Sequence, residues 1–236
     1  TKDSNGDGTP EIWGLDFSAA TFTFPAWQTV FGGKVIDERG EVAIAGPASI
    51  KALQSGIDLV TGYQIAPPPA STEYQMFYKG KSGMFFHYGW NIDGLRQAAD
   101  FEWDVLPIPN ADAGAGNMVL GGLFMIDAYS KQSEAAWELV KYLTSEKVQQ
   151  RIAREAGVFF PRKSFFAGNI YVKPGMPPYN WTGIGEAYNV SQPYPLVANL
   201  DKIRSIISAV VGNAFKQVVT PEAALADAAR QIKDLL

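Results

Sequence analysis

The sequence predicts an α/β fold in which short strands alternate with longer helices. Apolar residues recur at helical spacing in several segments, a pattern typical of amphipathic helices packed on a core. Short apolar runs bounded by Gly and Pro separate these segments and are typical of buried strands. Hydrophobic residues make up 47% of the 236 residues, enough for a sizeable core, and a domain of roughly 100–200 residues would make this one large or two small domains.

The first half of the chain alternates predicted strands and helices. The predicted strands are residues 11–15, 82–88 and 103–107. Residues 47–60 predict an amphipathic helix, because Pro47 suits a first helical turn and apolar residues then repeat at helical spacing up to Gly62. A second helix is expected from about residue 71 to Gly80.

The second half predicts one more strand, at residues 121–126, followed mainly by helices. The predicted helices are residues 133–143, 145–156, 200–215 and a last one that begins at Pro221. Thr220 is the expected N-cap of the last helix. Residues 164–199 contain five prolines and are predicted to be irregular, and a loop of this length usually is functional or wraps a surface.

The charge balance and the rare residue types exclude several functions. Because 20 Lys and Arg stand against 24 Asp and Glu, we expect neither nucleic acid nor an anionic membrane surface as a partner. The absence of cysteine excludes disulfides and a thiolate nucleophile, and the single His87 excludes a metal site with two His ligands. Apolar runs stay well below the roughly 20 residues that span a bilayer, and the first residues lack the features of a secretion signal.

The first residues place oxygen-bearing side chains at alternate positions around glycines, as calcium-binding loops do. The candidate calcium ligands are Asp3, Asn5, Asp7, Thr9 and Glu11. An EF-hand loop that begins at Asp3 needs a bidentate Glu at its twelfth position, where Gly14 stands. Two interpretations therefore stay open: a structural calcium site, or a surface turn rich in Asp and Asn.

Six short sequence motifs follow one another along the chain in a characteristic order. They are Lys79-Gly80-Lys81-Ser82-Gly83-Met84 with Gly89-Trp90; Asp104-Val105-Leu106-Pro107-Ile108-Pro109; Gly121-Gly122; Ala135-Ala136-Trp137-Glu138 with Tyr142-Leu143-Thr144-Ser145; Gly157-Val158-Phe159-Phe160-Pro161-Arg162; and Thr220-Pro221-Glu222-Ala223-Ala224-Leu225. Each block alone is weak, but six in order are specific. Together they resemble the family 1 extracellular solute-binding proteins, the maltose-binding-protein-like receptors of carbohydrate ABC importers, over essentially the whole chain.

The resemblance implies a lobe of the type II periplasmic-binding-protein fold together with part of a second lobe. Residues 1–107 and 158–236 would form the C-terminal lobe. Residues 108–157 would be the crossover segment that belongs to the N-terminal lobe, most of which has no counterpart here. We therefore expect a C-terminal fragment, in which the crossover segment pairs with a second copy, docks irregularly on its own C-terminal lobe, or meets an N-terminal lobe supplied separately.

The resemblance also implies which residues contact a ligand. Trp90 would stack on a sugar, Gly89 would let the backbone approach closely, and Gly121 and Gly122 would open the crossover strand beside the ligand. Arg162 would reach toward the cleft and pair with hydroxyl groups. The alternatives are a core tryptophan at position 90, a simple bend at the glycines and a surface salt bridge at Arg162.

Further aromatic residues are weaker candidates for ligand contact. Phe22 and Trp27 lie in a stretch that resembles the aromatic segment of maltose-type members, although Thr21 stands where those often have Tyr. Trp181 is a candidate for the rim of the cleft, and the alternative for all three residues is the hydrophobic core.

The predicted function is therefore the capture of a sugar or related polyol, without catalysis and without a required cofactor, for delivery to the permease subunits of an ABC importer. The predicted location is extracytoplasmic, either in the periplasm or lipid-anchored at the outer face of the cell membrane. The alternative is a glycoside hydrolase or another carbohydrate-active enzyme, which needs a pair of carboxylates. The candidate carboxylates are Asp93, Glu102, Asp104 and Asp127. A third alternative is an accessory interaction module.

Overall fold

A computed structural model describes residues 1–8, 10–17, 23–68, 76–160 and 162–236. The chain divides into two compact units. The first unit comprises Thr1–His87, Pro107–Val119 and Glu186–Leu236, and the second unit comprises Tyr88–Leu106 and Leu120–Gly185. These boundaries differ from those of the predicted lobes, whose assignment stays a prediction.

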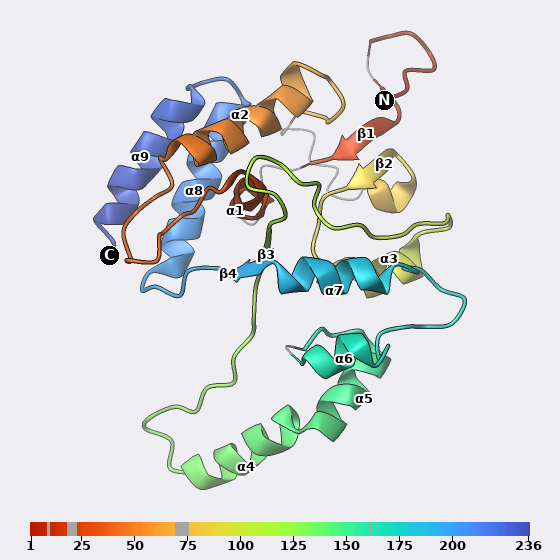
Figure 1. Cartoon of the computed structure of the whole chain (residues 1–236), viewed down its shortest axis with the longest axis vertical. Helices are drawn as coiled ribbons and strands as arrows, with labels where there is room; N and C mark the ends of the chain where they lie inside the picture. The colour runs from red at the N-terminus through yellow and green to blue at the C-terminus, as the bar shows by residue number, and fades with distance from the viewer. Residues whose placement is uncertain (9, 18–22, 69–75, 161) are drawn as a thin grey trace. The chain divides into compact units, whose positions relative to one another are not determined.

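Helices α2 (Pro47–Thr61), α8 (Leu200–Phe215) and α9 (Pro221–Lys233) supply much of the apolar core of the first unit (Figure 1). Their buried faces meet through residues that include Leu53, Ile57, Ile203, Ile207, Leu225 and Ile232. The predictions for all three helices are confirmed. Thr220 caps α9 as expected, since its side-chain oxygen accepts a hydrogen bond from the backbone N–H of Ala223 at 3.3 Å.

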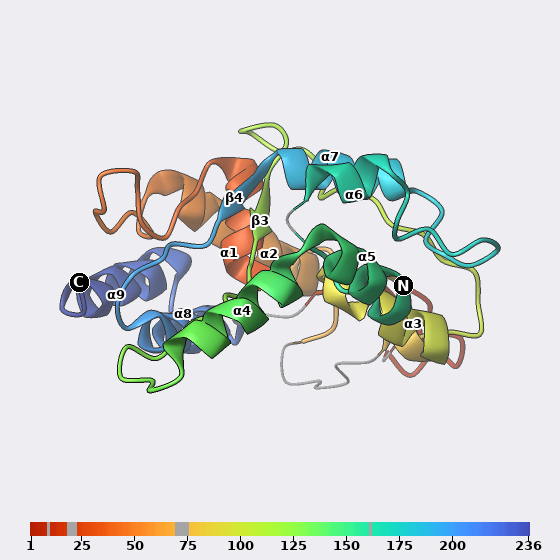
Figure 2. The same ribbon diagram turned by 90° about the horizontal axis from the view of Figure 1, so that it is seen from below.

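Short parallel strand pairs complete the first unit. Strand β1 (Trp13–Asp16) pairs with β2 (Ser82–Phe85), and β3 (Asn117–Val119) pairs with β4 (Ser191–Pro193), which lies beside it in both ribbon views (Figures 1 and 2). The aromatic stretch near the N-terminus contributes helix α1 (Thr23–Trp27) and the short 3₁₀ helix η1 (Gln28–Phe31). A second 3₁₀ helix, η2 (Phe77–Lys79), ends at Gly80.

The predicted strands at residues 103–107 and 121–126 are wrong, because both segments are irregular in the structure. The strand of the second region lies slightly earlier, at β3, where the chain meets β4. An apolar run alone does not form a strand, since its backbone groups also need a partner to pair with. The first half of the predicted helix between residues 71 and 80 lies outside the described residues, and in its second half the structure has the short 3₁₀ helix η2, which ends at Gly80 as expected.

The second unit is mainly helical. Helices α4 (Ser133–Thr144) and α5 (Glu146–Ala156) confirm the predictions. Gly157 ends α5 at a φ of +62°, and a Cβ there would lie 1.8 Å from Oδ2 of Asp93, so glycine is required at this position. The sequence did not predict the 3₁₀ helix η3 (Gly89–Asn91) or helix α3 (Ile92–Ala98).

The prediction of an irregular segment over residues 164–199 is wrong in part. The segment contains most of helix α6 (Lys163–Ala167), all of helix α7 (Trp181–Asn189) and β4. The prolines lie between or at the ends of these elements, where the missing N–H group costs little. The prolines of this segment therefore indicated the connections between its helices and strand, and not an irregular structure along its whole length.

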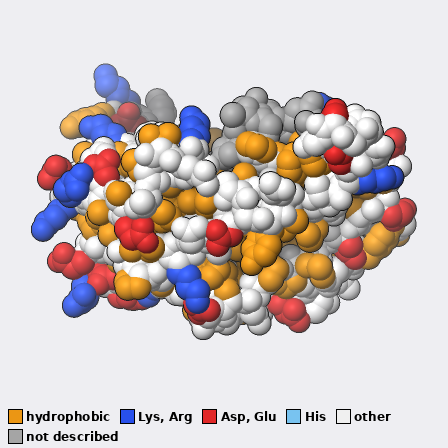
Figure 3. Space-filling model, turned by 90° about the horizontal axis from the view of Figure 1, so that it is seen from above, with side chains coloured by type: hydrophobic (Ala, Val, Ile, Leu, Met, Phe, Trp, Pro, Cys, Tyr) orange, Lys and Arg blue, Asp and Glu red, His pale blue; other side chains and the backbone are white. Residues whose placement is uncertain are grey.

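Apolar side chains reach the surface over parts of the molecule. On the face shown in Figure 3, hydrophobic side chains lie among acidic and basic ones. In the second unit the exposed apolar residues include Leu123, Phe124, Met125, Trp137, Leu139 and Tyr142. Among the described residues, no helix combines the length and the apolar character that crossing a membrane would require.

Candidate functional site

Trp90 lies in η3, and three irregular residues separate η3 from the end of strand β2 at Phe85. Its exposed fraction is 53%, so the alternative of a core tryptophan is wrong. The indole stacks on the ring of Tyr88 with ring centroids 4.4 Å apart and only 6° between the ring planes. An exposed, flat aromatic surface suits the apolar face of a sugar ring, and the role of Trp90 in binding one stays a prediction.

Gly89 lets the backbone approach an aromatic ring of the protein itself. A Cβ at position 89 would lie 2.7 Å from Cε2 of Phe159, closer than real Cβ atoms come. Phe159 in turn packs on Tyr171, with ring centroids 4.8 Å apart. In the structure the neighbour that requires glycine at position 89 is therefore this aromatic cluster of the second unit, and the approach of the backbone to a ligand stays a prediction.

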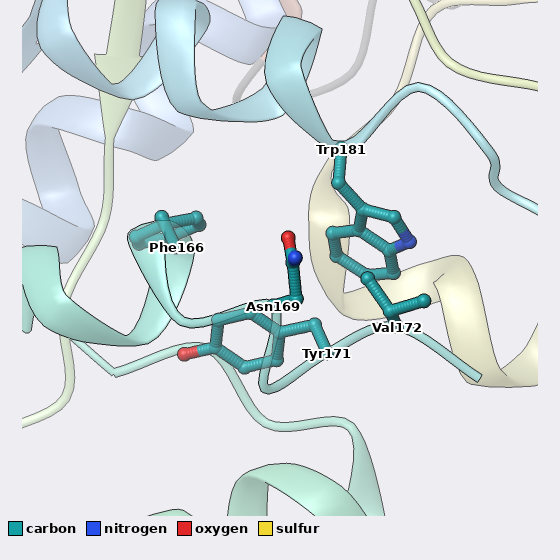
Figure 4. Close-up of a pocket in the computed structure, with 5 residues that line it drawn as sticks. All are labelled: Phe166, Asn169, Tyr171, Val172 and Trp181. Carbon is teal, nitrogen blue, oxygen red and sulfur yellow. The ribbon is translucent and has the colours of Figure 1, made fainter. Parts of the chain in front are cut away.

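Trp181 is largely packed within that cluster. Its ring stacks on the buried Tyr171 at 5.7 Å with an interplanar angle of 19°. Figure 4 shows Trp181 and Tyr171 together with Phe166, Asn169 and Val172, which line a pocket of about 160 Å³, a volume that includes open solvent. Ligand pockets usually measure roughly 300–1,000 Å³, so these contacts favour the core interpretation of Trp181.

Arg96 of helix α3 holds the cluster and its loop together, a role that was not predicted from the sequence. Its side chain is 3% exposed. Nε donates to the carbonyl of Pro177 at 2.7 Å, Nη2 donates to the carbonyl of Tyr171 at 3.3 Å, and the guanidinium lies 5.6 Å from the ring centroid of Trp181. The i, i+3 spacing of Asp93 and Arg96 is the sequence signal that would have indicated this ion pair.

Asp93 is paired and not poised for acid–base chemistry. Its Oδ1 accepts hydrogen bonds from Nη1 of Arg96 at 2.9 Å and from Nζ of Lys173 at 3.1 Å. Burial acts to raise the pKa of the Asp93 carboxyl, but the hydrogen bonds and charges of Arg96 and Lys173 outweigh it and lower the pKa. Asp93 therefore stays ionised and stabilises the second unit.

The other candidate carboxylates also hold the chain in place. Oδ1 of Asp104 accepts the backbone N–H groups of Tyr179 and Asn180, both at 2.8 Å. Glu102 accepts the hydroxyl of Tyr179 at 3.0 Å, a bond that raises the pKa of this tyrosine. Asp127 accepts from a backbone N–H two residues further along the chain. Each of these carboxylates thus accepts hydrogen bonds that hold the chain in place. The hydrolase alternative does not account for this structural role.

Arg162 connects the helices of the second unit. Nε donates to Oε1 of Gln149 at 2.6 Å, and Nη2 donates to the carbonyl of Thr144 at 2.8 Å. These partners are an amide side chain and a helix C-terminus, so they favour a structural role different from the surface salt bridge considered above. Contact between Arg162 and a ligand stays a prediction.

Trp27 of the first unit packs against the core. Nε1 donates to the hydroxyl of Ser55 at 2.9 Å, and the ring meets Phe17 and Phe86 edge to face at 5.4 and 5.8 Å. These contacts favour the core alternative for Trp27, while Phe22 lies outside the described residues.

Gly121 and Gly122 are exposed in an irregular segment, and a Cβ at either position would have no atom of the described residues within 4 Å. No close approach among the described residues requires glycine there, so a role beside a ligand stays a prediction.

Asp3 organises the N-terminal loop by accepting backbone hydrogen bonds. Its Oδ1 accepts from Gly6 at 2.7 Å, and its Oδ2 accepts from Gly8 at 2.9 Å. Asn5 accepts the backbone N–H of Asp7 at 2.9 Å in the same manner. These are the bonds of a turn rich in Asp and Asn, which the described geometry favours.

Glu11 and Thr9 are the remaining candidate calcium ligands. Glu11 accepts the backbone N–H of Ser4 at 2.7 Å, and Thr9 lies outside the described residues. Within the part of the chain that the structure describes, no group of three or more His, Asp and Glu side chains is placed to hold a metal ion. Both interpretations of this loop, a calcium site and a turn rich in Asp and Asn, therefore stay open.

Asp16, at the end of β1, is a buried carboxylate that sequence reasoning missed. Burial raises its pKa to about 6, although a backbone hydrogen bond from Phe77 acts to lower it. Its Oδ2 has no hydrogen-bond partner among the described residues. The alternation of polar and apolar residues along β1 gave no sign of this burial.

Comparisons with known proteins define the class to which this chain belongs. The model of the bacterial extracellular solute-binding protein family matches residues 2–150, more than half of the chain. The chain therefore belongs to the bacterial extracellular solute-binding protein family, whose members bind solutes and are not enzymes.

Particular relatives support the fold. The chain is 27% identical over 154 residues to a probable ABC transporter-binding protein of Deinococcus radiodurans. The aligned region covers 61% of this chain and 36% of that protein. The structure of maltose-bound MalE3 of T. maritima superposes with a TM-score of 0.78 at 23% identity, over 98% of this chain and 66% of that one. A solute-binding protein of Thermotoga lettingae bound to α-D-tagatose superposes with a TM-score of 0.81 at 22% identity, over 95% and 60%.

These likenesses confirm the predicted α/β fold of the periplasmic-binding-protein type. The chain spans about a third of the curated relative and about 60–66% of these solved structures.

Proposed function

We propose that the protein to which this chain belongs captures a sugar or related polyol outside the cytoplasm and delivers it to an ABC importer. The observation that carries this proposal is Trp90, an exposed indole stacked flat on Tyr88 in a chain of the extracellular solute-binding family. Stacking on the C–H face of a sugar is the chemistry that such a surface offers. Structural relatives of the same fold hold maltose and α-D-tagatose, which supports a carbohydrate ligand.

The partners in this proposal are the carbohydrate and the permease subunits of the importer. The match to a probable ABC transporter-binding protein supports the second partner. The proposed location is the periplasm or a lipid anchor at the outer face of the cell membrane, in keeping with the extracellular family.

We also propose that residues 108–157 complete an N-terminal lobe, as the resemblance implies. Helix α4 supports this assignment, because none of its residues is buried although its sequence is amphipathic. One lobe covers only one face of a sugar, so we expect this chain alone to bind weakly, at millimolar rather than micromolar concentrations of sugar.

The proposal is tested by titrating the chain with maltotriose and with α-D-tagatose while recording saturation-transfer NMR spectra. We expect transfer to the sugar protons that is lost in Trp90→Ala and kept in Tyr129→Ala, a matched aromatic residue that is 93% exposed. Absence of transfer to a wider sugar panel would contradict the proposal. Release of reducing sugar during incubation would favour the hydrolase instead.

A further inference from the structure

Tyr88 and Trp90 form a stacked pair on the surface of the second unit. Their ring centroids lie 4.4 Å apart with the planes only 6° from parallel, closer and flatter than the edge-to-face contacts in the core of the first unit. About half of Trp90 stays exposed although one of its faces meets the Tyr88 ring. The ring of Tyr88 therefore covers one face of the indole, and part of the indole stays exposed.

The backbone between the two rings is also constrained. The carbonyl of Tyr88 accepts the N–H of Asn91 at 3.1 Å and so closes the turn that carries Trp90. Gly89 lies against Phe159, where a Cβ would come within 2.7 Å of the ring. Phe159 is held by the aromatic cluster around Tyr171. The turn thus rests on a packed surface, and on this turn the ring of Tyr88 lies flat against the indole of Trp90.

We propose that Tyr88 is a positioning residue that holds the Trp90 indole flat for a cyclic sugar. This inference rests on the proposed function. A tryptophan that is already fixed loses little side-chain freedom when a ligand binds, and pre-organisation of this kind improves affinity. The exposed part of the indole then meets the apolar face of a pyranose ring, whose C–H groups lie in one flat layer.

The geometry also defines the class of ligand. A rigid plane matches a closed ring, which presents its C–H groups together, better than an open-chain polyol, which must first be ordered. We therefore expect the site to prefer a pyranose such as the glucose units of maltotriose to sorbitol, by about tenfold in affinity.

Incorporation of 5-fluorotryptophan into the full 236-residue chain allows the test by ¹⁹F NMR. Trp90→Phe assigns the Trp90 signal, and maltotriose and sorbitol are the ligands titrated. In Tyr88→Leu we expect the Trp90 signal to shift because the ring current is lost, while the signals of the other tryptophans stay in place. The affinity of the Tyr88→Leu variant for maltotriose should fall about 3- to 10-fold relative to wild type.

Two further variants separate positioning from general damage. Tyr88→Phe keeps the ring and should restore both the Trp90 signal and the affinity, to within about twofold. Tyr129→Leu removes an exposed tyrosine of the same unit and should change neither.

The positioning role is overturned if wild-type chain binds maltotriose while Tyr88→Leu binds it equally well, or if Tyr88→Leu moves all the signals together. Equal binding of sorbitol and maltotriose overturns the preference for a ring. If wild-type chain binds no sugar, the proposed function fails and the binding role of Tyr88 with it, whereas the unliganded Trp90 signal still reports whether the stacked pair forms.

Discussion

The first unit and the second unit contain equally clear amphipathic helices but bury them differently. Helix α8 packs its apolar residues into the core, among them Ile203, Ile207 and Val211. Helix α4 has no buried residue, and its Leu139 is 56% exposed. An apolar stripe thus predicts a helix reliably, whereas its burial depends on whether the rest of the molecule supplies a partner surface.

The two units also differ in how they are held together. The first unit relies on a continuous apolar core. The second unit has a smaller aromatic cluster, supplemented by the buried guanidinium of Arg96 and its hydrogen bonds. Stability in the second unit therefore depends more on polar contacts, in which removal of one partner leaves the other buried without a hydrogen bond.

The largest expected effect is a core substitution in the first unit. Ile207→Ala should lower the free energy of unfolding by about 2–5 kcal/mol, because it leaves a cavity between packed helices. Leu139→Ala, on the exposed face of α4, should change it by no more than about 0.5 kcal/mol. Urea denaturation of both variants tests the contrast, and equal losses would show that α4 is buried in solution.

Removal of the guanidinium is expected to have the next largest effect. Arg96→Ala should cost about 2–4 kcal/mol, since it leaves two carbonyls without their donor and deprives Asp93 of a partner. The control is Arg151→Ala, which removes an exposed pair with Glu155 and should cost less than about 0.5 kcal/mol. The free energy of unfolding is again measured by urea denaturation. A similar loss in both variants would contradict the importance of the buried Arg96 guanidinium.

The buried Asp16 gives the first unit a dependence on pH. Its pKa is raised to about 6 from an ordinary value of 3.8, so the folded chain holds a proton that the unfolded chain has lost between about pH 4 and 6. Stability should therefore fall as pH rises through this window, and the penalty is fully present above about pH 6.

Asp16→Asn tests that dependence. The variant should be more stable than wild type by about 1–3 kcal/mol at pH 7.5 and nearly equal to it at pH 4, as measured by denaturation across this range. Asp100→Asn, at an exposed position, is the control and should leave the curve unchanged. A constant difference between Asp16→Asn and wild type at all pH values would argue against titration of Asp16.

The exposed apolar surface of the second unit should make the isolated chain associate with itself. Residues such as Leu139, Leu123 and Met125 present apolar area that water does not favour. Leu139→Gln should weaken association by about tenfold, whereas Leu196→Gln, at an exposed site of the first unit, should not. Light scattering over a range of concentrations measures this, and a strictly monomeric wild-type chain would contradict it.

The smallest effect is expected at the N-terminal loop. Because Asp3 already accepts the N–H groups of Gly6 and Gly8, the turn forms without a metal, and Tm should change by less than about 1 °C with millimolar calcium or with chelator. An increase in Tm with calcium that disappears in Asp3→Ala would instead support the calcium site.

The sequence by itself determined the features that local chemistry controls. Helical spacing and end signals located α2, α5 and α9, since a cap or a glycine acts on its own helix. The ordered blocks indicated the family, which the family model confirms. The exposure of Trp90 excludes a core tryptophan, and its position at a ligand cleft stays a prediction.

Only the tertiary structure decided the features that arise from residues far apart in the chain. Arg96 meets Pro177 and Tyr171, and Gly89 meets Phe159, through contacts that no local pattern encodes. The strand expected at residues 121–126 does not form, whereas β3 forms where β4 meets it. The physical reason is the same in each case. Side-chain burial, strand pairing and the pKa of a carboxyl depend on which distant groups replace water around a residue. Sequence periodicity reports only the conformational preference of one segment.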